Sequence, residues 1–360
     1  MFNKVIAYSR MRNQCIAWVK GRTSYEVIQR LGALQAQDYT QALWAIGLRM
    51  RIANTEEIER TIADQKIVLT WAMRGTLHFV PSDDVNWMIK LLTPRVLAKD
   101  KRRLEQLELD PKVITQCEGI IYGALKEKKR MNRPALMELL EGAGFNTKNQ
   151  RGYHLLWYLA QTGLICLGPM EEKQQTFVLL EDWVHINNKL SVEESLEELA
   201  KRYFSGHGPA TVHDFAWWSG LTITEARHGI EAAQEALYSE SFGGLEYWMG
   251  KDVAAEEQST VCLLPGYDEY LLGYKDRSAV LKAEYAPLIV PGKNGVFAPM
   301  IIVDGQIAGT WKRTIKKDGI DIAIRPFAEL GFRKELVLEE TRRYCEFIGL
   351  PLTQVFIQED

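Results

Sequence analysis

A pattern of helices followed by a β-hairpin occurs three times along the chain, and it constrains the fold more than any other feature. Pairs of β-rich runs meet at turns at Arg74-Gly75, between Gly168 and Gln175, and at Gly243-Gly244. Each pair follows segments with helical periodicity, and the copies recur at intervals of about 70 to 90 residues. Helices followed by a two-stranded hairpin form the skeleton of a winged helix-turn-helix, a DNA-binding module. The sequence therefore predicts three tandem winged helices.

The last hundred residues or so change to short β-rich runs separated by turns. Asp304-Gly305 between two apolar runs predicts a tight hairpin. We expect a small β-barrel with a closing helix over 334–348 and a final strand over 352–357, and thus an α+β fold class. The predicted barrel strands are Val261–Leu264, Leu288–Val290, Val296–Val303, Ile307–Trp311 and Ile320–Ile324. The predicted domains are winged helices at 1–94, 95–190 and 191–258 and the barrel at 259–360.

The bulk composition is that of a soluble globular protein, with 46% apolar and 25% charged residues among 360. No apolar run reaches the roughly 18 residues needed to span a bilayer, and the N-terminus lacks the pattern of a secretion signal. The five cysteines are scattered without a CxxC pair, which argues against a zinc site or a disulfide framework. We expect a cytoplasmic protein with no membrane association, no metal and no cofactor.

Positive charge gathers in one part of a chain whose net charge is −3. From Arg95 to Arg151 there are 13 Lys and Arg against 8 Asp and Glu, whereas from Glu171 to Glu198 there are 2 against 8. Two basic clusters in one segment are consistent with a surface that faces phosphates. Each cluster alone is better explained as the solvated face of a helix.

Two glutamines one residue apart, Gln35 and Gln37, lie between an amphipathic helix and a second apolar run. Thr23 and Glu26 predict a capping box at the start of that first helix. If the chain is extended at the glutamines, both amides point to one side and can act as a two-pronged clamp. If it is helical, they point to different sides and are two unrelated polar residues. The spacing alone leaves both possibilities open.

Two further groups of polar residues are candidates for contacts with DNA. The first lies around the first hairpin, where the alternative is a histidine that bonds the backbone. The second follows a strand expected to end at Trp311, where the alternative is a solvated turn. The candidates are Arg74, Thr76 and His78 in the first group and Lys312, Arg313 and Lys316 in the second.

Asp268 and Glu269 are the alternative catalytic group, a pair of carboxylates as in glycoside hydrolases. Adjacent residues in a strand point to opposite faces, so the two cannot both serve one site from a strand. We expect a structural role instead, with Arg277 or Lys275 as the partner.

Five stretches of sequence carry a resemblance to a known family. They are LGALQAQDY at 31–39, WAMRGTLH at 71–78, GPATVHDFAWWSG at 208–220, LPGYDEYLLGYKDRS at 264–278 and PMIIVDGQIAGTW at 299–311. With these, the chain resembles the AlkZ-like winged-helix DNA glycosylases over its full length. The resemblance implies three tandem winged helices and a C-terminal β-barrel around a concave channel for duplex DNA. It also implies that the family's Gln-apolar-Gln motif falls on Gln35-Ala36-Gln37, which makes Gln35 and Gln37 the catalytic residues.

The activity that this resemblance implies is excision of N-alkylated purines, including the unhooking of interstrand crosslinks. A purine alkylated at N7 is already cationic, so it can leave without being protonated by an acid. What remains is to stabilise an oxocarbenium-like sugar and to place a water, as in glycoside hydrolysis. The expected partner is double-stranded DNA carrying alkylated purines, and the expected state is a monomer. The alternatives are a winged-helix transcription regulator without catalytic activity and another non-catalytic DNA-binding protein.

Overall fold

The structure is a computed structural model that describes residues 2–18, 20–185, 188–251, 259–292, 295–329 and 333–358. Its contacts divide the chain into two compact units. The first unit comprises Met1–Ile58 and Leu196–Asp360, and the second comprises Glu59–Ser195. The four domains expected along the chain stay a prediction, and residues 252–258, at the expected start of the barrel, lie outside the described residues.

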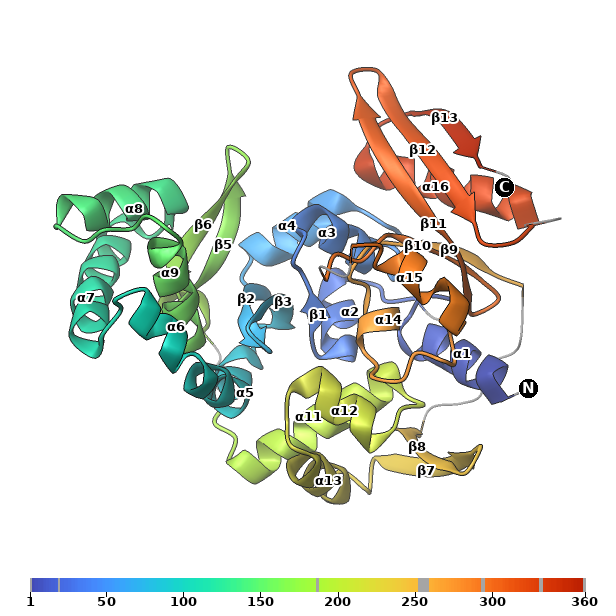
Figure 1. The fold of residues 1–360 in the computed structure, drawn as a ribbon, viewed down its shortest axis with the longest axis horizontal. Coiled ribbons are helices and arrows are strands. Elements are labelled where there is room, and N and C mark those ends of the chain that lie inside the picture. The colour runs from blue at the N-terminus through green and yellow to red at the C-terminus, as the bar shows by residue number, and fades with distance from the viewer. Residues whose placement is uncertain are drawn as a thin grey trace. The chain divides into compact units, whose positions relative to one another are not determined.

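The second unit combines helices with strands, of which β2, β3, β5 and β6 are labelled in Figure 1. Its strands follow the order β3-β2-β5-β6-β4. Both predicted hairpins of this part of the chain are confirmed. They lie edge to edge, since Leu69 of the first pairs with Leu167 of the second. The turn of the second hairpin is shorter than expected and is formed by Glu172 and Lys173, both with positive φ. The strands are β2 (Ile67–Met73), β3 (Thr76–Pro81), β4 (Met131–Asn132), β5 (Ile165–Glu171) and β6 (Gln174–Leu179).

The helices of this unit begin where local capping chemistry predicts. Asn132 caps α8 by accepting a hydrogen bond from the Ala135 amide, with Pro134 in the first turn. Asp110 caps α7 in the same way. The helices are α5 (Val85–Lys99), α6 (Lys101–Gln106), α7 (Pro111–Lys128), α8 (Arg133–Gly142), α9 (Arg151–Gln161) and α10 (Leu180–Trp183); α4 (Thr55–Ala63) joins the two units.

The first unit begins with short helices, and the chain returns to this unit within α11. The third predicted hairpin is confirmed, with Gly243 and Gly244 both at positive φ in its turn. The N-terminal elements are α1 (Phe2–Asn13), α2 (Ser24–Leu31), β1 (Leu34–Gln35) and α3 (Tyr39–Gly47). The later ones are α11 (Val192–His207), α12 (Val212–Ser219), α13 (Ile223–Ala232), β7 (Leu237–Phe242) and β8 (Leu245–Gly250).

The C-terminal strands form an open sheet, so the expected β-barrel is wrong for the part of the chain that the structure describes. The strand order is β13-β12-β11-β10-β9, with β9 and β13 at its two edges. α16 (Lys334–Ile348) lies between β12 and β13 in the chain and packs on β9 and β13 (Figure 1). This helical crossover explains why β13 pairs with β12 in parallel. The strands are β9 (Val261–Leu264), β10 (Met300–Val303), β11 (Gln306–Lys316), β12 (Gly319–Pro326) and β13 (Leu352–Ile357).

Two expected strands near this sheet differ in the structure. The run Leu288–Val290 is not a strand, because α15 (Ala286–Ile289) begins with a proline at its first turn. The run Val296–Val303 is a strand only over β10. The remaining short helices are α14 (Glu269–Leu272) and the 3₁₀ helix Ala283–Tyr285.

A close contact between α11 and the C-terminal end of α2 sets the position of the chain that follows α2. A Cβ atom on Gly206 of α11 would lie 2.3 Å from the carbonyl oxygen of Arg30, so only glycine permits this approach. Gly32 then ends α2 with a φ of 75°. The segment that carries the two glutamines begins immediately afterwards.

Candidate active site

The segment Gln35-Ala36-Gln37 is not helical, which removes the helical alternative that the spacing left open: Gln35 ends the strand β1 and Gln37 lies in a bend. α2 ends at Leu31 and α3 begins only at Tyr39, with β1 between them. Ala36 is 2% exposed, whereas Gln35 is half-buried and Gln37 is exposed. A half-buried Gln35, a buried Ala36 and an exposed Gln37 form the alternating pattern expected of a chain that turns Ala36 toward the core. This burial pattern is compatible with a two-pronged amide clamp.

Both carboxylate oxygens of Asp38, which follows the motif, accept hydrogen bonds from Gln41. Asp38 caps α3, with Oδ1 accepting from the Gln41 amide at 3.1 Å and Oδ2 from Gln41 Nε2 at 3.0 Å. Gln41 Oε1 in turn accepts a hydrogen bond from the amide of Gly266. The far end of the motif is thus tied to the loop that precedes α14.

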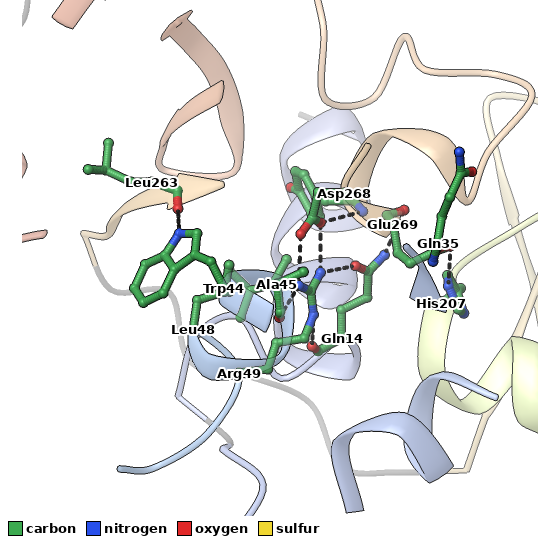
Figure 2. A network of polar contacts seen from close by, with 12 residues as sticks. Gln14, Gln35, Trp44, Ala45, Leu48, Arg49, His207, Leu263, Asp268 and Glu269 are labelled. Atoms are coloured by element: carbon green, nitrogen blue, oxygen red, sulfur yellow. Dashed lines mark hydrogen bonds and ion pairs between the residues drawn. The ribbon is translucent and has the colours of Figure 1, made fainter. Parts of the chain in front are cut away.

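Glu269, the first residue of α14, lies directly behind the motif (Figure 2). Its carboxylate is fully buried and accepts the Gln35 main-chain N–H on Oε1 at 2.9 Å. Oε2 accepts Trp218 Nε1–H at 2.9 Å and lies 3.4 Å from His207 Nε2. In Figure 2 the side chain of Gln35 extends away from this buried network. Glu269 therefore holds the main chain at Gln35, and the Gln35 side chain points away from that carboxylate.

Asp268 has the structural role that was expected, but its partner is Arg49 and not Arg277 or Lys275. Two parallel bonds of 2.8 and 2.7 Å join the two side chains, and both are fully buried (Figure 2). Burial would lower the pKa of Arg49, but the adjacent Asp268 carboxylate outweighs it and the pKa is raised. Arg277 instead donates to the carbonyl of Leu271 at 3.1 Å. The expectation failed because it sought a partner nearby in the sequence.

Arg74, Thr76 and His78 lie on the β2–β3 hairpin of the second unit. The turn places Arg74 and Gly75 at φ of 52° and 73°, and Trp157 Nε1 donates to the Gly75 carbonyl at 3.0 Å. His78 is fully buried, with Nδ1 2.8 Å from the Thr76 carbonyl and Nε2 3.4 Å from Arg74 Nη2. The histidine therefore supports the hairpin from inside, and Arg74 and Thr76 are half-buried.

Lys312, Arg313 and Lys316 lie on β11, which continues to Lys316 where a loop was expected. Lys312 and Lys316 point to one face because they are an even number of residues apart, and Arg313 points to the other. Arg313 donates to the hydroxyl of Tyr344 and lies 5.8 Å from its ring. Lys312 is exposed, and Lys316 is exposed but ion-paired with Asp321.

A cavity of about 690 Å³ opens in the first unit beside Asp38 and Gln41. Its lining includes three cations from β11 and β12 and the exposed apolar residues Leu288 and Val296. The three cations are Lys312, Arg313 and Arg325. The cavity therefore combines positive charge and apolar surface next to the residue that follows the motif.

No metal-binding group of three or more His, Cys, Asp or Glu side chains occurs among the described residues. In the same parts of the chain no helix is long and apolar enough to cross a bilayer. All five cysteines are buried free thiols.

Three residues that surround the motif were not predicted: Arg49, Trp218 and His207. One signal for Arg49 exists in the sequence, since it is a charged residue directly after the apolar run 42–48. A buried arginine requires a buried acid, and Asp268 is such an acid. Trp218 and His207 carry no local signal, because only the packing of α11 and α12 brings them to Glu269.

Comparison with known proteins agrees with this fold. The chain is 25% identical over 330 residues to an interstrand DNA cross-link repair glycosylase of Streptomyces sahachiroi, which covers 84% of this chain and 85% of that protein. The solved structure of Streptomyces sahachiroi DNA glycosylase AlkZ superposes with a TM-score of 0.82 at 22% identity and covers 99% of both chains. The model of the AlkZ-like DNA glycosylases matches residues 28–347. These matches favour the enzyme over a transcription regulator. The chain belongs to the AlkZ-like DNA glycosylase family.

Proposed function

We propose that this DNA glycosylase releases N7-alkylated purines from double-stranded DNA, with Gln35 and Gln37 as its catalytic pair. The observation that carries the proposal is that both glutamines lie outside any helix, on either side of the buried Ala36, with Gln35 half-buried and Gln37 exposed. The nearby carboxylates are already engaged: Asp38 caps α3, Asp268 holds Arg49, and Glu269 holds Gln35 and Trp218. We therefore assign the chemistry to the two amides of the motif.

Neutral amides suit a leaving group that needs no acid. The bond between C1′ and N9 breaks with its electron pair going to the cationic base, which leaves neutral. A water oxygen adds to C1′, and one proton passes to solvent. One amide orients that water and the other holds the sugar-phosphate, since each amide has two N–H donors and an acceptor oxygen. Two positioned groups that stabilise an oxocarbenium-like sugar meet the same demand as in glycoside hydrolysis.

The proposed DNA contacts follow from which cationic and polar side chains are accessible. Lys312 and Lys316 are exposed on one face of β11 and would contact phosphates. Arg74 and Thr76 would do so from the β2–β3 hairpin, with buried His78 holding Arg74 in place. Arg313 contributes charge from its position against Tyr344.

Interstrand crosslinks are proposed as further substrates. A crosslinked base is tied to both strands and cannot be rotated into a closed pocket. A catalytic pair in which Gln37 is exposed does not require such rotation. The relative from Streptomyces sahachiroi is named as an interstrand cross-link repair glycosylase, which supports the extension to this chain.

The test is base release from defined duplexes. Duplex DNA with a single N7-methylguanine is incubated with protein and treated with alkali, and strand breaks are compared with a protein-free control. We expect breaks with the wild type and only the spontaneous background with a Gln35→Ala, Gln37→Ala double variant. Equal cleavage by both proteins would show that the catalytic assignment is wrong. A mustard-crosslinked duplex, scored for strand separation, tests the crosslink proposal independently.

A further inference from the structure

Glu269 is a buried carboxylate that touches the main chain of the proposed catalytic segment and not its side chains. We propose that Glu269 is a positioning residue, which fixes the place of the Gln35 amide by accepting the Gln35 main-chain N–H. This inference rests on the proposed function, because it assumes that Gln35 contacts the substrate. Glu269 itself is fully buried and lies behind the motif, so it does not contact the reacting atoms.

Both carboxylate oxygens of Glu269 have N–H partners in fixed positions. Oε1 receives the Gln35 N–H and Oε2 receives the Trp218 indole N–H, each at 2.9 Å. Trp218 is fully buried and tilted against Tyr203, with 4.9 Å between ring centroids. His207 stacks on the same Tyr203 ring at 4.8 Å and places Nε2 3.4 Å from Oε2. The carboxylate therefore has no room to rotate.

The main chain of α14, the helix that begins with Glu269, is also fixed by hydrogen bonds. Asp268 caps α14 through the Tyr270 amide and is clamped by Arg49. The main-chain carbonyl of Glu269 accepts from Gln14 Nε2 at 3.4 Å, and Gln14 Oε1 accepts from Arg49 Nη2 at 2.9 Å. A chain of buried contacts thus connects Arg49 on one side to the Gln35 amide on the other (Figure 2).

The hydrogen bond from the Gln35 N–H to Glu269 fixes the position of β1, which is too short to be fixed by strand pairing alone. β1 has only two residues, and the chain leaves extended geometry at Ala36. Without an acceptor behind Gln35, its N–H would be buried beside an apolar side chain and the segment would shift to satisfy it. A shift of about 1 Å in a catalytic group can cost about 100-fold in rate. Glu269 therefore contributes to the rate of base release and little to the affinity for DNA.

The experiment measures the single-turnover rate of N7-methylguanine release and the Kd for the duplex, with spontaneous depurination subtracted. Glu269→Ala should release the base about 10- to 100-fold more slowly, with a Kd within about twofold of the wild type. Glu269→Gln keeps one acceptor oxygen for the Gln35 N–H but turns its NH2 group toward the Trp218 N–H donor, so it should recover only part of that loss. If Glu269→Ala does not fold, Glu269→Met, which keeps the volume without an acceptor, replaces it.

Tyr270→Phe is the matched control, because it removes a buried hydrogen bond in the same neighbourhood without changing the side chains that contact Glu269. The Tyr270 hydroxyl donates to the Gly305 carbonyl at 2.8 Å. This variant should lose thermal stability and keep the wild-type rate. If it slows base release as much as Glu269→Ala, the effect of Glu269 is merely structural and the inference is overturned.

A double-mutant comparison separates this inference from the proposed function. If Glu269 acts through Gln35, then Glu269→Ala should not slow Gln35→Ala any further. An equal additional loss in that background would overturn the positioning role while leaving Gln35 catalytic. If Gln35→Ala instead matches the wild type, the proposed function fails and the inference fails with it.

Discussion

The buried pair of Arg49 and Asp268 predicts a large loss of stability when either residue is neutralised. All five N–H donors of the guanidinium are used within the first unit. Nε donates to the Gln14 carbonyl at 3.0 Å, Nη1 to the Ala45 carbonyl and Asp268, and Nη2 to Gln14 Oε1 and Asp268. Both side chains are 0% exposed, so neither charge can be solvated once its partner is gone.

Asp268→Asn and Arg49→Met should each cost about 3 to 5 kcal/mol, since each leaves one buried charge uncompensated. That is a large part of the roughly 5 to 15 kcal/mol that stabilises a typical domain. A double variant, Arg49→Met with Asp268→Leu, removes both charges and should lose much less than the sum of the single variants. Asp268 also caps α14, so about 1 kcal/mol of loss should remain in the double variant.

The assay is denaturant unfolding followed by circular dichroism, with the shift of the midpoint read at an unchanged slope. A non-additivity of about 3 kcal/mol or more between the two sites is expected. Single variants that each cost less than about 1 kcal/mol, the level of a surface ion pair, would refute the reasoning. Strictly additive losses would refute it as well, because they would show that the two charges are not coupled.

Two further predictions concern groups whose pKa is shifted by burial. Burial lowers the pKa of Lys20 to about 8, so between pH 8 and its ordinary value of 10.5 the unfolded chain binds more protons than the native one. The stability of the wild type relative to Lys20→Met should therefore rise by up to about 3 kcal/mol over that range, as measured by chemical unfolding at several pH values; a flat or falling difference would contradict it. Burial raises the pKa of Cys262 to about 12 and of Cys345 to about 11, so both stay protonated thiols at pH 8. A chromogenic disulfide reagent at pH 8 should react with these two thiols only after unfolding in guanidinium, and fast reaction of the native protein would show that they are accessible.

Features set by a few neighbouring residues were predictable from the sequence. The cap at Asn132 and the hairpin turns at Arg74-Gly75 and Gly243-Gly244 depend on side chains within four positions, and the structure contains them. Thr23 likewise accepts from the Glu26 amide at 3.2 Å. The other half of that capping box differs, because the Glu26 carboxylate accepts from the amide of Arg22 instead.

Features set by distant residues were not predictable in the same way. Arg49 and Asp268 are 219 positions apart, and neither position specifies the other. The open C-terminal sheet depends on α16, which brings β13 beside β12 in parallel and leaves β9 and β13 as edges. β-branched composition favours strands, but it does not determine whether the last strand closes a barrel.

The candidate site was predictable only in part, because it depends on both neighbouring and distant residues. The two glutamines could be singled out, but whether they share a face depends on where α2 ends and α3 begins. The role of Glu269 could not be inferred, because it requires α14, α11 and α12 to meet behind the motif.

The joint action of Gln35 and Gln37 is tested by the single-turnover rate of base release for Gln35→Ala, Gln37→Ala and the double variant on one N7-methylguanine duplex. Because the two amides serve one transition state, each single variant should lose about 100-fold or more, and the double variant should lose little beyond that. The Kd for the duplex should change only slightly, since the other proposed phosphate contacts, on β11 and on the β2–β3 hairpin, are unchanged. A wild-type rate for either single variant would contradict the assignment. So would two losses that simply multiply.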